Sequence, residues 1–287
     1  MKNKIILAGS GYLGGYIISE MTEKSPSCQI IEVSRTKKTR IASVKSTKMD
    51  LDDDPLKLEP FAGGIIIYMA PPSTVSLEDC RIKNFLKNLN GVKIKSFVYI
   101  STSGVYGNCD GKEVDELHQV NPETDRAKRR VSAETQLANY CKQKDINLVI
   151  LRVPGIYGKG RLPINRIRAG EPIIKKEESK VTNLIHVEDL ARIVVASTMS
   201  ENLNKCEIVN VSDGNPTSST NYYEITGMLL GIKITNYITY LEAQSVYTEQ
   251  RLSFLKESRV LNVNKMFNLF PDCIKYVSLE DGIRASL

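Results

Sequence analysis

Short apolar runs alternate with amphipathic segments through the first half of the chain. The apolar runs cover residues 5–8, 30–33, 64–69, 96–100 and 147–151, and shorter ones follow at 183–186 and 207–211. Helical spacing of apolar residues marks segments 13–22, 75–89 and 127–142. Buried strands that alternate with helices are typical of right-handed βαβ units. The pattern therefore predicts an α/β fold with a doubly wound parallel sheet.

The second half has a different character. A loop-rich segment begins at Gly158, and helices with short polar connections follow Pro216. We expect a first domain over residues 1–154, to which strands at about 182–213 return, and a smaller C-terminal domain over residues 155–287. With 287 residues, the chain is long enough to bury a sizeable core.

Composition and charge narrow the classes of partner. The net charge is +6, but the densest basic runs, 37–40 and 126–130, are short and carry no zinc-finger or RNA-binding signature. Six cysteines lie far apart with no pair at metal-ligand spacing, and no apolar run approaches the length of a membrane span. We expect a cytoplasmic protein without a metal, nucleic acid or membrane partner, and the charge equally suits an anionic small molecule.

A glycine-rich turn follows the first predicted strand and opens the first predicted helix. Gly9, Gly11 and Gly14 form the pattern G-x-G-x-x-G in that context. Here Gly9 permits the tight turn, Gly11 lets the backbone approach a pyrophosphate, and Gly14 lets the helix pack close to the strand. The predicted cofactor site includes the intervening residues Ser10, Tyr12 and Leu13.

The residues that follow the second strand indicate which dinucleotide binds. An NAD-specific protein places an acid about 20 residues beyond the last glycine, where it binds the adenosine ribose. This chain has Ser34 and Arg35 there. A hydroxyl and a guanidinium can bind a 2′-phosphate that a carboxylate would repel. The sequence favours NADP, with NAD as the alternative.

Further motifs follow in a fixed order along nearly the whole chain. They are KMDLD at 48–52, YMAPP at 68–72, ISTSGVYG at 100–107, LRVPGIYG at 151–158, IHVEDLA at 185–191 and VNV at 209–211. Together they resemble the extended and atypical short-chain dehydrogenase/reductase superfamily. The resemblance implies a Rossmann fold, an NADP-binding first domain, a substrate-binding second domain and, by analogy, a homodimer.

The resemblance also implies roles for single residues. Asp50 would reach the adenine amino group, and Leu51 would contribute its backbone. The cofactor would pass Ala70, Pro71 and Pro72, and Pro154 would lie near the nicotinamide. The catalytic hydroxyl would come from Thr102, with Ser103 beside it.

One departure affects the chemistry. The superfamily transfers protons with a tyrosine and a lysine four residues later, and this register holds Arg126 and Arg130. The literal Tyr140–Lys144 pair lies too near the end of its predicted helix to serve. A guanidinium stays protonated, so it can stabilise an oxyanion or bind a phosphate but cannot shuttle protons.

Two interpretations of function follow. The first is an NADP-dependent oxidoreductase or nucleotide-sugar epimerase/dehydratase-like enzyme with an anionic, phosphorylated or nucleotide-linked substrate. Its proton would come from a group other than the missing tyrosine. Tyr106, Tyr157 and His186 are candidates, although packing roles suit them better. The alternative is a non-catalytic NADP-binding sensor or regulatory module of the same fold.

Overall fold

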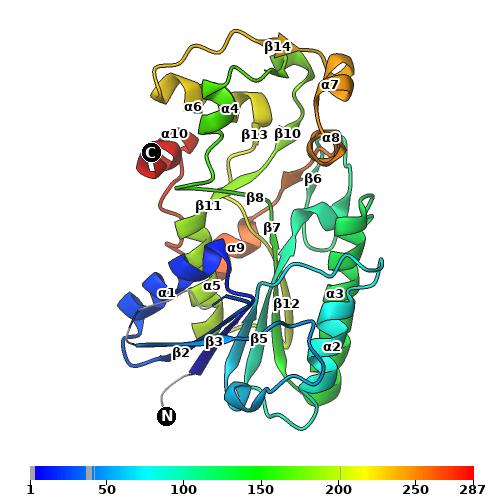
Figure 1. The fold of residues 1–287 in the computed structure, drawn as a ribbon, viewed down its shortest axis with the longest axis vertical. Helices are drawn as coiled ribbons and strands as arrows, with labels where there is room; N and C mark the ends of the chain where they lie inside the picture. The colour runs from blue at the N-terminus through cyan, green and yellow to red at the C-terminus, as the bar shows by residue number, and fades with distance from the viewer. Residues whose placement is uncertain (1–3, 37–40, 42, 201) are drawn as a thin grey trace.

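The computed structural model describes residues 4–36, 41, 43–200 and 202–287, so the basic run at 37–40 lies outside the described residues. Seven parallel strands form the central sheet: β1 (Lys4–Ala8), β2 (Gln29–Ser34), β3 (Val44–Lys48), β4 (Ile65–Tyr68), β5 (Ser96–Thr102), β7 (Asn147–Val153) and β12 (Cys206–Asn210). Their order is β12-β7-β5-β4-β1-β2-β3 (Figure 1). The order proceeds outward in both directions from β1 and β4. The predicted doubly wound α/β fold is confirmed.

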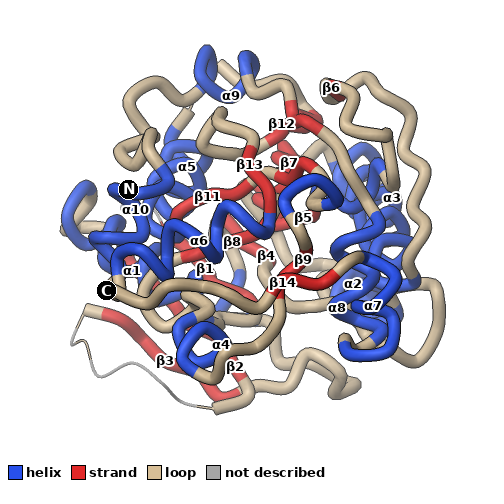
Figure 2. Tube along the Cα trace, turned by 90° about the horizontal axis from the view of Figure 1, so that it is seen from above, coloured by secondary structure: helices blue, strands red, loops and turns tan. Residues whose placement is uncertain are grey.

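Helices cover both faces of this sheet. On one face lie α1 (Tyr12–Lys24) and α5 (Val187–Met199), and on the other lie α2 (Cys80–Asn88) and α3 (Asp125–Lys144). The views in Figures 1 and 2 agree on this arrangement. Because both faces are buried, the inner strands are apolar at nearly every position.

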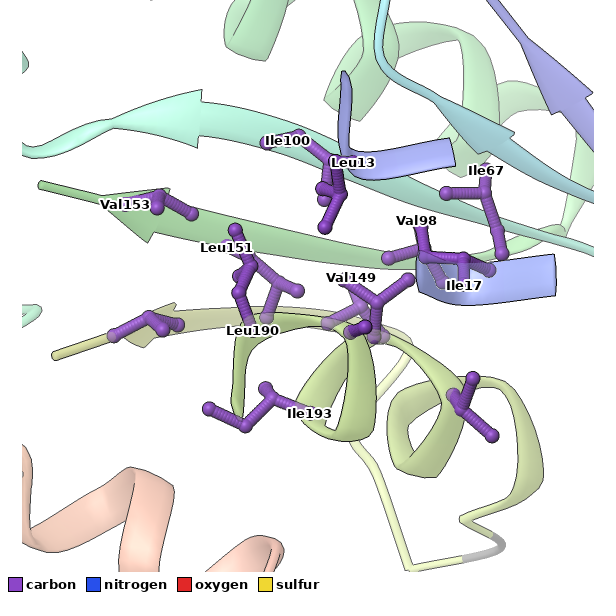
Figure 3. Packing of buried hydrophobic residues seen from close by; sticks show 14 of the residues in the cluster. Leu13, Ile17, Ile67, Val98, Ile100, Val149, Leu151, Val153, Leu190 and Ile193 are labelled. Carbon is purple, nitrogen blue, oxygen red and sulfur yellow. The ribbon is translucent and has the colours of Figure 1, made fainter. Parts of the chain in front are cut away.

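Alternation along β1 shows how the two sides of the core divide. Ile5 and Leu7 belong to the apolar cluster with α1 and α5, while Ile6 and Ala8 belong to the cluster with α2 and α3. Figure 3 shows the first cluster, in which Leu13 and Ile17 of α1 and residues of α5 meet side chains of β4, β5 and β7. Successive strand side chains point to opposite faces, so every second residue serves one layer.

The start of α2 differs from the predicted helix at 75–89. The helix begins at Cys80, because the Asp79 side chain accepts hydrogen bonds from the backbone nitrogens of Arg81 and Ile82. A side chain that caps a helix in this way fixes the residue at which the helix begins. Val75 and Leu77, near the start of the predicted helix, are exposed and belong to the preceding loop.

The rest of the chain forms short strand pairs and helices, most of which lie near the carboxyl ends of the large sheet, toward the top of Figure 1. The pairs are β8 (Gly155–Tyr157) with β11 (Leu184–His186), β9 (Ile173–Ile174) with β14 (Tyr237–Ile238), β10 (Val181–Thr182) with β13 (Thr217–Ser218), and β6 (Glu113–Val114) with β15 (Val260–Leu261). The helices are α4 (Ile164–Arg168), α6 (Ser219–Leu229), α7 (Tyr240–Val246), α8 (Glu249–Lys256), α9 (Asn264–Leu269) and α10 (Leu279–Ser286).

The two strands predicted to return to the first domain behave differently. Strand β12 pairs with β7 in the large sheet, whereas β11 pairs with β8 outside it. The boundary at residue 154 stays a prediction. Within the described ranges, no helix has both the length and the apolar character that a membrane crossing requires.

A buried ion pair fixes α3 against the sheet. Glu134 of α3 and Arg152 of β7 lie 2.8 Å apart, and their side chains are only 8% and 5% exposed. The Ser101 hydroxyl donates to Glu134 Oε1 at 2.5 Å, which adds β5 to the contact. Arg152 also donates to the Tyr106 hydroxyl at 3.0 Å, and that hydroxyl donates to Asn210 of β12 at 2.7 Å. The network joins α3 to three neighbouring strands.

Replacing Glu134 by alanine should lower the free energy of unfolding by about 3–5 kcal/mol, because it leaves the Arg152 charge buried without a partner. The control is Glu78→Ala, since the Glu78–Lys83 pair is 47% and 64% exposed. Its loss should stay below about 1 kcal/mol. Chemical denaturation measures both values. Equal losses of unfolding free energy in the two variants would show that the buried pair contributes no more to stability than the exposed pair.

Candidate functional site

The glycine turn is closely packed at two of its three glycines and open at the third. Gly9 has φ +79°, and a Cβ there would lie 2.6 Å from the Ala70 backbone. A Cβ on Gly14 would lie 2.1 Å from the Ser10 hydroxyl oxygen. On Gly11 the nearest atom would be 3.9 Å away. Gly11 is therefore the point at which a ligand can approach the backbone, at the N-terminus of α1.

A cavity of about 490 Å³ lies against this turn. It brings together most of the residues predicted for the adenosine half of the cofactor: Gly9, Ser10, Gly11, Ser34, Arg35, Asp50, Leu51, Ala70 and Pro71. Arg81 of α2 also lines it, although no sequence motif marked that residue. Pro72 and Gly14 do not line the cavity. The volume lies in the range typical of small-molecule sites.

Ser34 and Arg35 occupy different positions at this cavity. The Ser34 side chain is buried and its hydroxyl donates to the Thr36 carbonyl, so this proton is not available to a phosphate. Arg35 is exposed at the cavity. Of the two residues predicted to hold a 2′-phosphate, the geometry leaves the donor role to Arg35.

A second cavity of about 400 Å³ shares Gly9, Gly11 and Pro71 with the first. Tyr12, Leu13, Thr102 and Pro154 line it, together with three arginines: Arg126, Arg130 and Arg161. No acidic residue is among the described residues that line it. The second cavity is cationic, which suits phosphate groups.

The three arginines are held by different contacts. The Arg161 guanidinium lies over the Tyr12 ring at 4.0 Å from its centroid. Arg130 donates to the Tyr99 hydroxyl at 3.0 Å and to the Ile100 carbonyl at 2.9 Å.

Arg126 lies over the Phe254 ring at 4.1 Å from its centroid. Burial lowers the pKa of Arg126, but a guanidinium still carries its charge at ordinary pH.

A third cavity of about 480 Å³ shares Thr102, Arg126 and Pro154 with the second, and Ser103 also lines it. The Thr102 hydroxyl oxygen accepts a hydrogen bond from the Gly104 nitrogen at 3.2 Å. Its own proton can therefore be donated to a ligand oxygen. Thr102 lies where the second and third cavities meet, as expected for a residue between cofactor and substrate.

Glu257 is the acidic residue that the described part of the chain contributes to the third cavity. Its side chain is 9% exposed, and its Oε2 is held by Arg259, whose Nε donates to the Gly107 carbonyl at 3.0 Å. Its Oε1 is buried and has no hydrogen-bond partner among the described residues. Glu257 Oε2 and Thr102 Oγ1 would lie 3.8 and 3.4 Å from a Cβ on Gly104. A carboxylate thus lies near the predicted catalytic hydroxyl.

No sequence signal identifies Glu257. It follows α8, more than 150 residues after Thr102, in a segment without a recognisable motif. Only the fold of the second half brings it to the cavity.

The side chains considered as proton donors lie away from the three cavities. The Tyr106 hydroxyl is engaged between Arg152 and Asn210. Tyr157 is packed against His186, with ring centroids 5.2 Å apart, and His186 Nε2 lies 3.0 Å from the Ser286 hydroxyl. The Tyr140 hydroxyl contacts the Leu89 carbonyl, near the C-terminal end of α3.

Comparison with known proteins supplies the family. The model of the NAD dependent epimerase/dehydratase family matches residues 5–212, which is more than half of the chain. The chain belongs to this family. The match includes the glycine turn, Thr102 and Arg126, and it ends before Glu257.

Two curated relatives are similar to the chain at low identity. A putative UDP-glucose 4-epimerase of Methanocaldococcus jannaschii is 24% identical over 259 residues, which cover 80% of this chain and 83% of that protein. Human dTDP-D-glucose 4,6-dehydratase is 24% identical over 186 residues, which cover 56% of this chain and 53% of that protein. The chain therefore spans about half the length of the second relative.

Solved structures share the fold over nearly the whole chain. A functionally unknown conserved protein from Silicibacter pomeroyi has a TM-score of 0.82 at 22% identity, covering 99% of this chain and 98% of that one. UDP-glucuronic acid 4-epimerase from Bacillus cereus, in complex with UDP-glucuronic acid and NAD, has a TM-score of 0.79 at 19% identity, covering 99% and 97%. At such identities the likeness concerns the fold.

Replacing Gly11 by valine should lower NADPH affinity by roughly a hundredfold or more, about 2.7 kcal/mol, because the side chain would project where the ligand approaches. Gly15→Val is the control, since a Cβ on Gly15 meets nothing within 4 Å. Fluorescence titration with NADPH measures the affinity, and thermal unfolding confirms that both variants fold. Unchanged binding by the Gly11 variant would rule out the pyrophosphate site.

Proposed function

We propose that this protein is an NADP(H)-dependent enzyme that oxidises or reduces a hydroxyl-bearing carbon of an anionic, nucleotide-linked substrate. One observation carries the proposal: three cavities form a continuous row, with shared lining residues at each junction. Thr102 and Arg126 lie at the junction between the last two. A dinucleotide in the first two cavities would present its reactive end to a substrate in the third.

The preference for NADP rests on the first cavity. Arg35 is an exposed cation at that cavity, and no carboxylate stands at the end of β2 to bind a free ribose hydroxyl. A guanidinium pairs well with a phosphate. The Bacillus cereus neighbour holds NAD. Support for NADP therefore comes from this chain's own residues and not from that neighbour.

The substrate class rests on the third cavity. Arg126, Lys180 and Arg259 line it and give it positive charge, while Glu257 can accept hydrogen bonds from hydroxyl groups. Such a cavity suits a ligand that combines phosphate groups with a polyol. The names of the relatives, a UDP-glucose epimerase and a dTDP-glucose dehydratase, support a nucleotide-linked sugar.

The chain's own residues divide the chemistry among them. When bound, the nicotinamide supplies or accepts a hydride, so the substrate hydroxyl must lose or regain a proton. Thr102 donates a hydrogen bond to the substrate oxygen. The Glu257 carboxylate, which lines the third cavity, accepts the proton, and Arg259 orients it. Arg126 and Arg130 stabilise negative charge without exchanging protons.

The alternative of a non-catalytic NADP sensor is favoured by one observation, the arginines in place of the tyrosine and lysine. A sensor, however, has no need of the third cavity or of a carboxylate beside Thr102. These features favour the enzyme.

Replacing Arg35 by glutamate should weaken NADPH binding roughly tenfold to a hundredfold and leave NADH binding unchanged or stronger, because a carboxylate repels the 2′-phosphate. Lys45→Glu makes the same charge change on the exposed face of β3, and Lys45 does not line the cavity. Its affinities should match the wild type. Paired titrations with NADPH and NADH measure the effect. An equal loss of NADH binding in Arg35→Glu would contradict the assignment.

Thr102→Ala and Glu257→Gln should each lower kcat by about a hundredfold or more while NADPH affinity stays unchanged. Glu249→Gln in α8 is the matched control. The assay follows NADP(H) absorbance and sugar products with UDP-glucose, UDP-glucuronic acid and dTDP-glucose. Tight NADPH binding without turnover of any nucleotide-linked sugar would favour the sensor.

A further inference from the structure

Arg81 joins the two loops that line the first cavity. Its Nε donates to Asp52 Oδ1 at 2.7 Å and its Nη2 to Asp52 Oδ2 at 2.5 Å. Its Nη1 donates to the Pro71 carbonyl. Asp52 follows the Asp50–Leu51 segment after β3, and Pro71 belongs to the loop after β4. One guanidinium thus connects α2 to both cofactor-binding segments.

From these contacts we infer that Arg81 is a positioning residue for the adenosine half of the cofactor. The inference rests on the proposed NADP(H) function and adds a determinant of affinity to it. Arg81 holds the two loops in their ligand-binding positions before the cofactor arrives. When loops are already ordered before binding, less conformational entropy is lost when the ligand binds.

Burial and charge favour this role over a direct phosphate contact. The Arg81 side chain is 15% exposed, and each of its three nitrogens donates to Asp52 or Pro71. The hydrogen bond from Arg81 lowers the pKa of Asp52, so the pair stays ionised at neutral pH. The Arg81 charge is therefore compensated within the protein, and Arg35 remains the residue suited to a 2′-phosphate.

The start of α2 strengthens the same connection. The Asp79 carboxylate that caps α2 also accepts a hydrogen bond from the Ser73 nitrogen at 3.2 Å. The loop after β4 is thus tied to the helix at Pro71 and at Ser73. Through these two contacts, α2 fixes the position of the loop after β4, which forms part of the wall of the first cavity.

Arg129 provides a matched control within the same region. Its side chain is also 15% exposed, and its Nε donates to the Ser76 carbonyl in the loop before α2 at 2.6 Å. Arg129 lines neither of the cavities assigned to the cofactor. Loss of Arg129 removes a similar helix-to-loop hydrogen bond without touching the first cavity.

The experiment compares Arg81→Ala, Arg81→Lys and Arg129→Ala by titration with NADPH and with 2′,5′-ADP, which carries only the adenosine half. Arg81→Ala should weaken both ligands by the same factor, roughly tenfold. Arg81→Lys should recover only part of this loss, since one ammonium cannot reproduce the bidentate contact with Asp52. Arg129→Ala should bind both ligands as the wild type does.

Asp52→Ala removes the same link from the loop side and replaces Arg81→Ala if that variant fails to fold. Thermal unfolding without ligand separates loss of stability from loss of binding. Wild-type affinity for 2′,5′-ADP in the Arg81 and Asp52 variants would overturn the inference, as would an equal loss in Arg129→Ala. Failure of the wild type to bind NADPH and 2′,5′-ADP would instead refute the proposed function.

Discussion

The buried pair between Glu134 and Arg152 is the interaction on which the arrangement of the site depends. Two charges taken out of water are tolerated only when each is closely paired and further hydrogen-bonded, and Ser101 and Tyr106 complete that requirement here. The pair fixes α3 against β5 and β7. Because Arg126 and Arg130 lie in the first two turns of α3, the same contact sets them beside Thr102 at the end of β5.

The carboxyl edge of the sheet then determines where the parts of the site lie. The glycine turn after β1, the loops after β2, β3 and β4, and Thr102 at the end of β5 all lie at this edge, where ligands bind in doubly wound folds. The second half of the chain contributes Glu257 and Arg259 to the third cavity. Family membership and the row of cavities agree with cofactor binding, and in the proposed enzyme the proton moves through a group other than the arginines on α3. The chain thus carries the glycine turn of the proposed cofactor site, with arginines at the positions that the resemblance assigns to tyrosine and lysine.

The sequence predicts those features that follow from local chain geometry. Gly9, Gly11 and Gly14 act within one turn, and Thr102 and Arg126 occupy fixed positions relative to a strand end and a helix start. Residues whose role depends on distant contacts give no such signal. Arg81 acts through Asp52, which lies 29 positions away, and Glu257 comes to the cavity of Thr102 from another part of the fold. The capping of α2 by Asp79 and the engaged hydroxyl of Ser34 likewise depend on side-chain hydrogen bonds that periodicity does not show.

A crystal structure with NADP bound tests the central claim most directly. We expect the pyrophosphate over Gly11, the 2′-phosphate at Arg35 and the nicotinamide at the junction of Thr102 and Arg126, with Glu257 across the third cavity. A nicotinamide outside this junction, or a cofactor bound away from the glycine turn, would contradict the account.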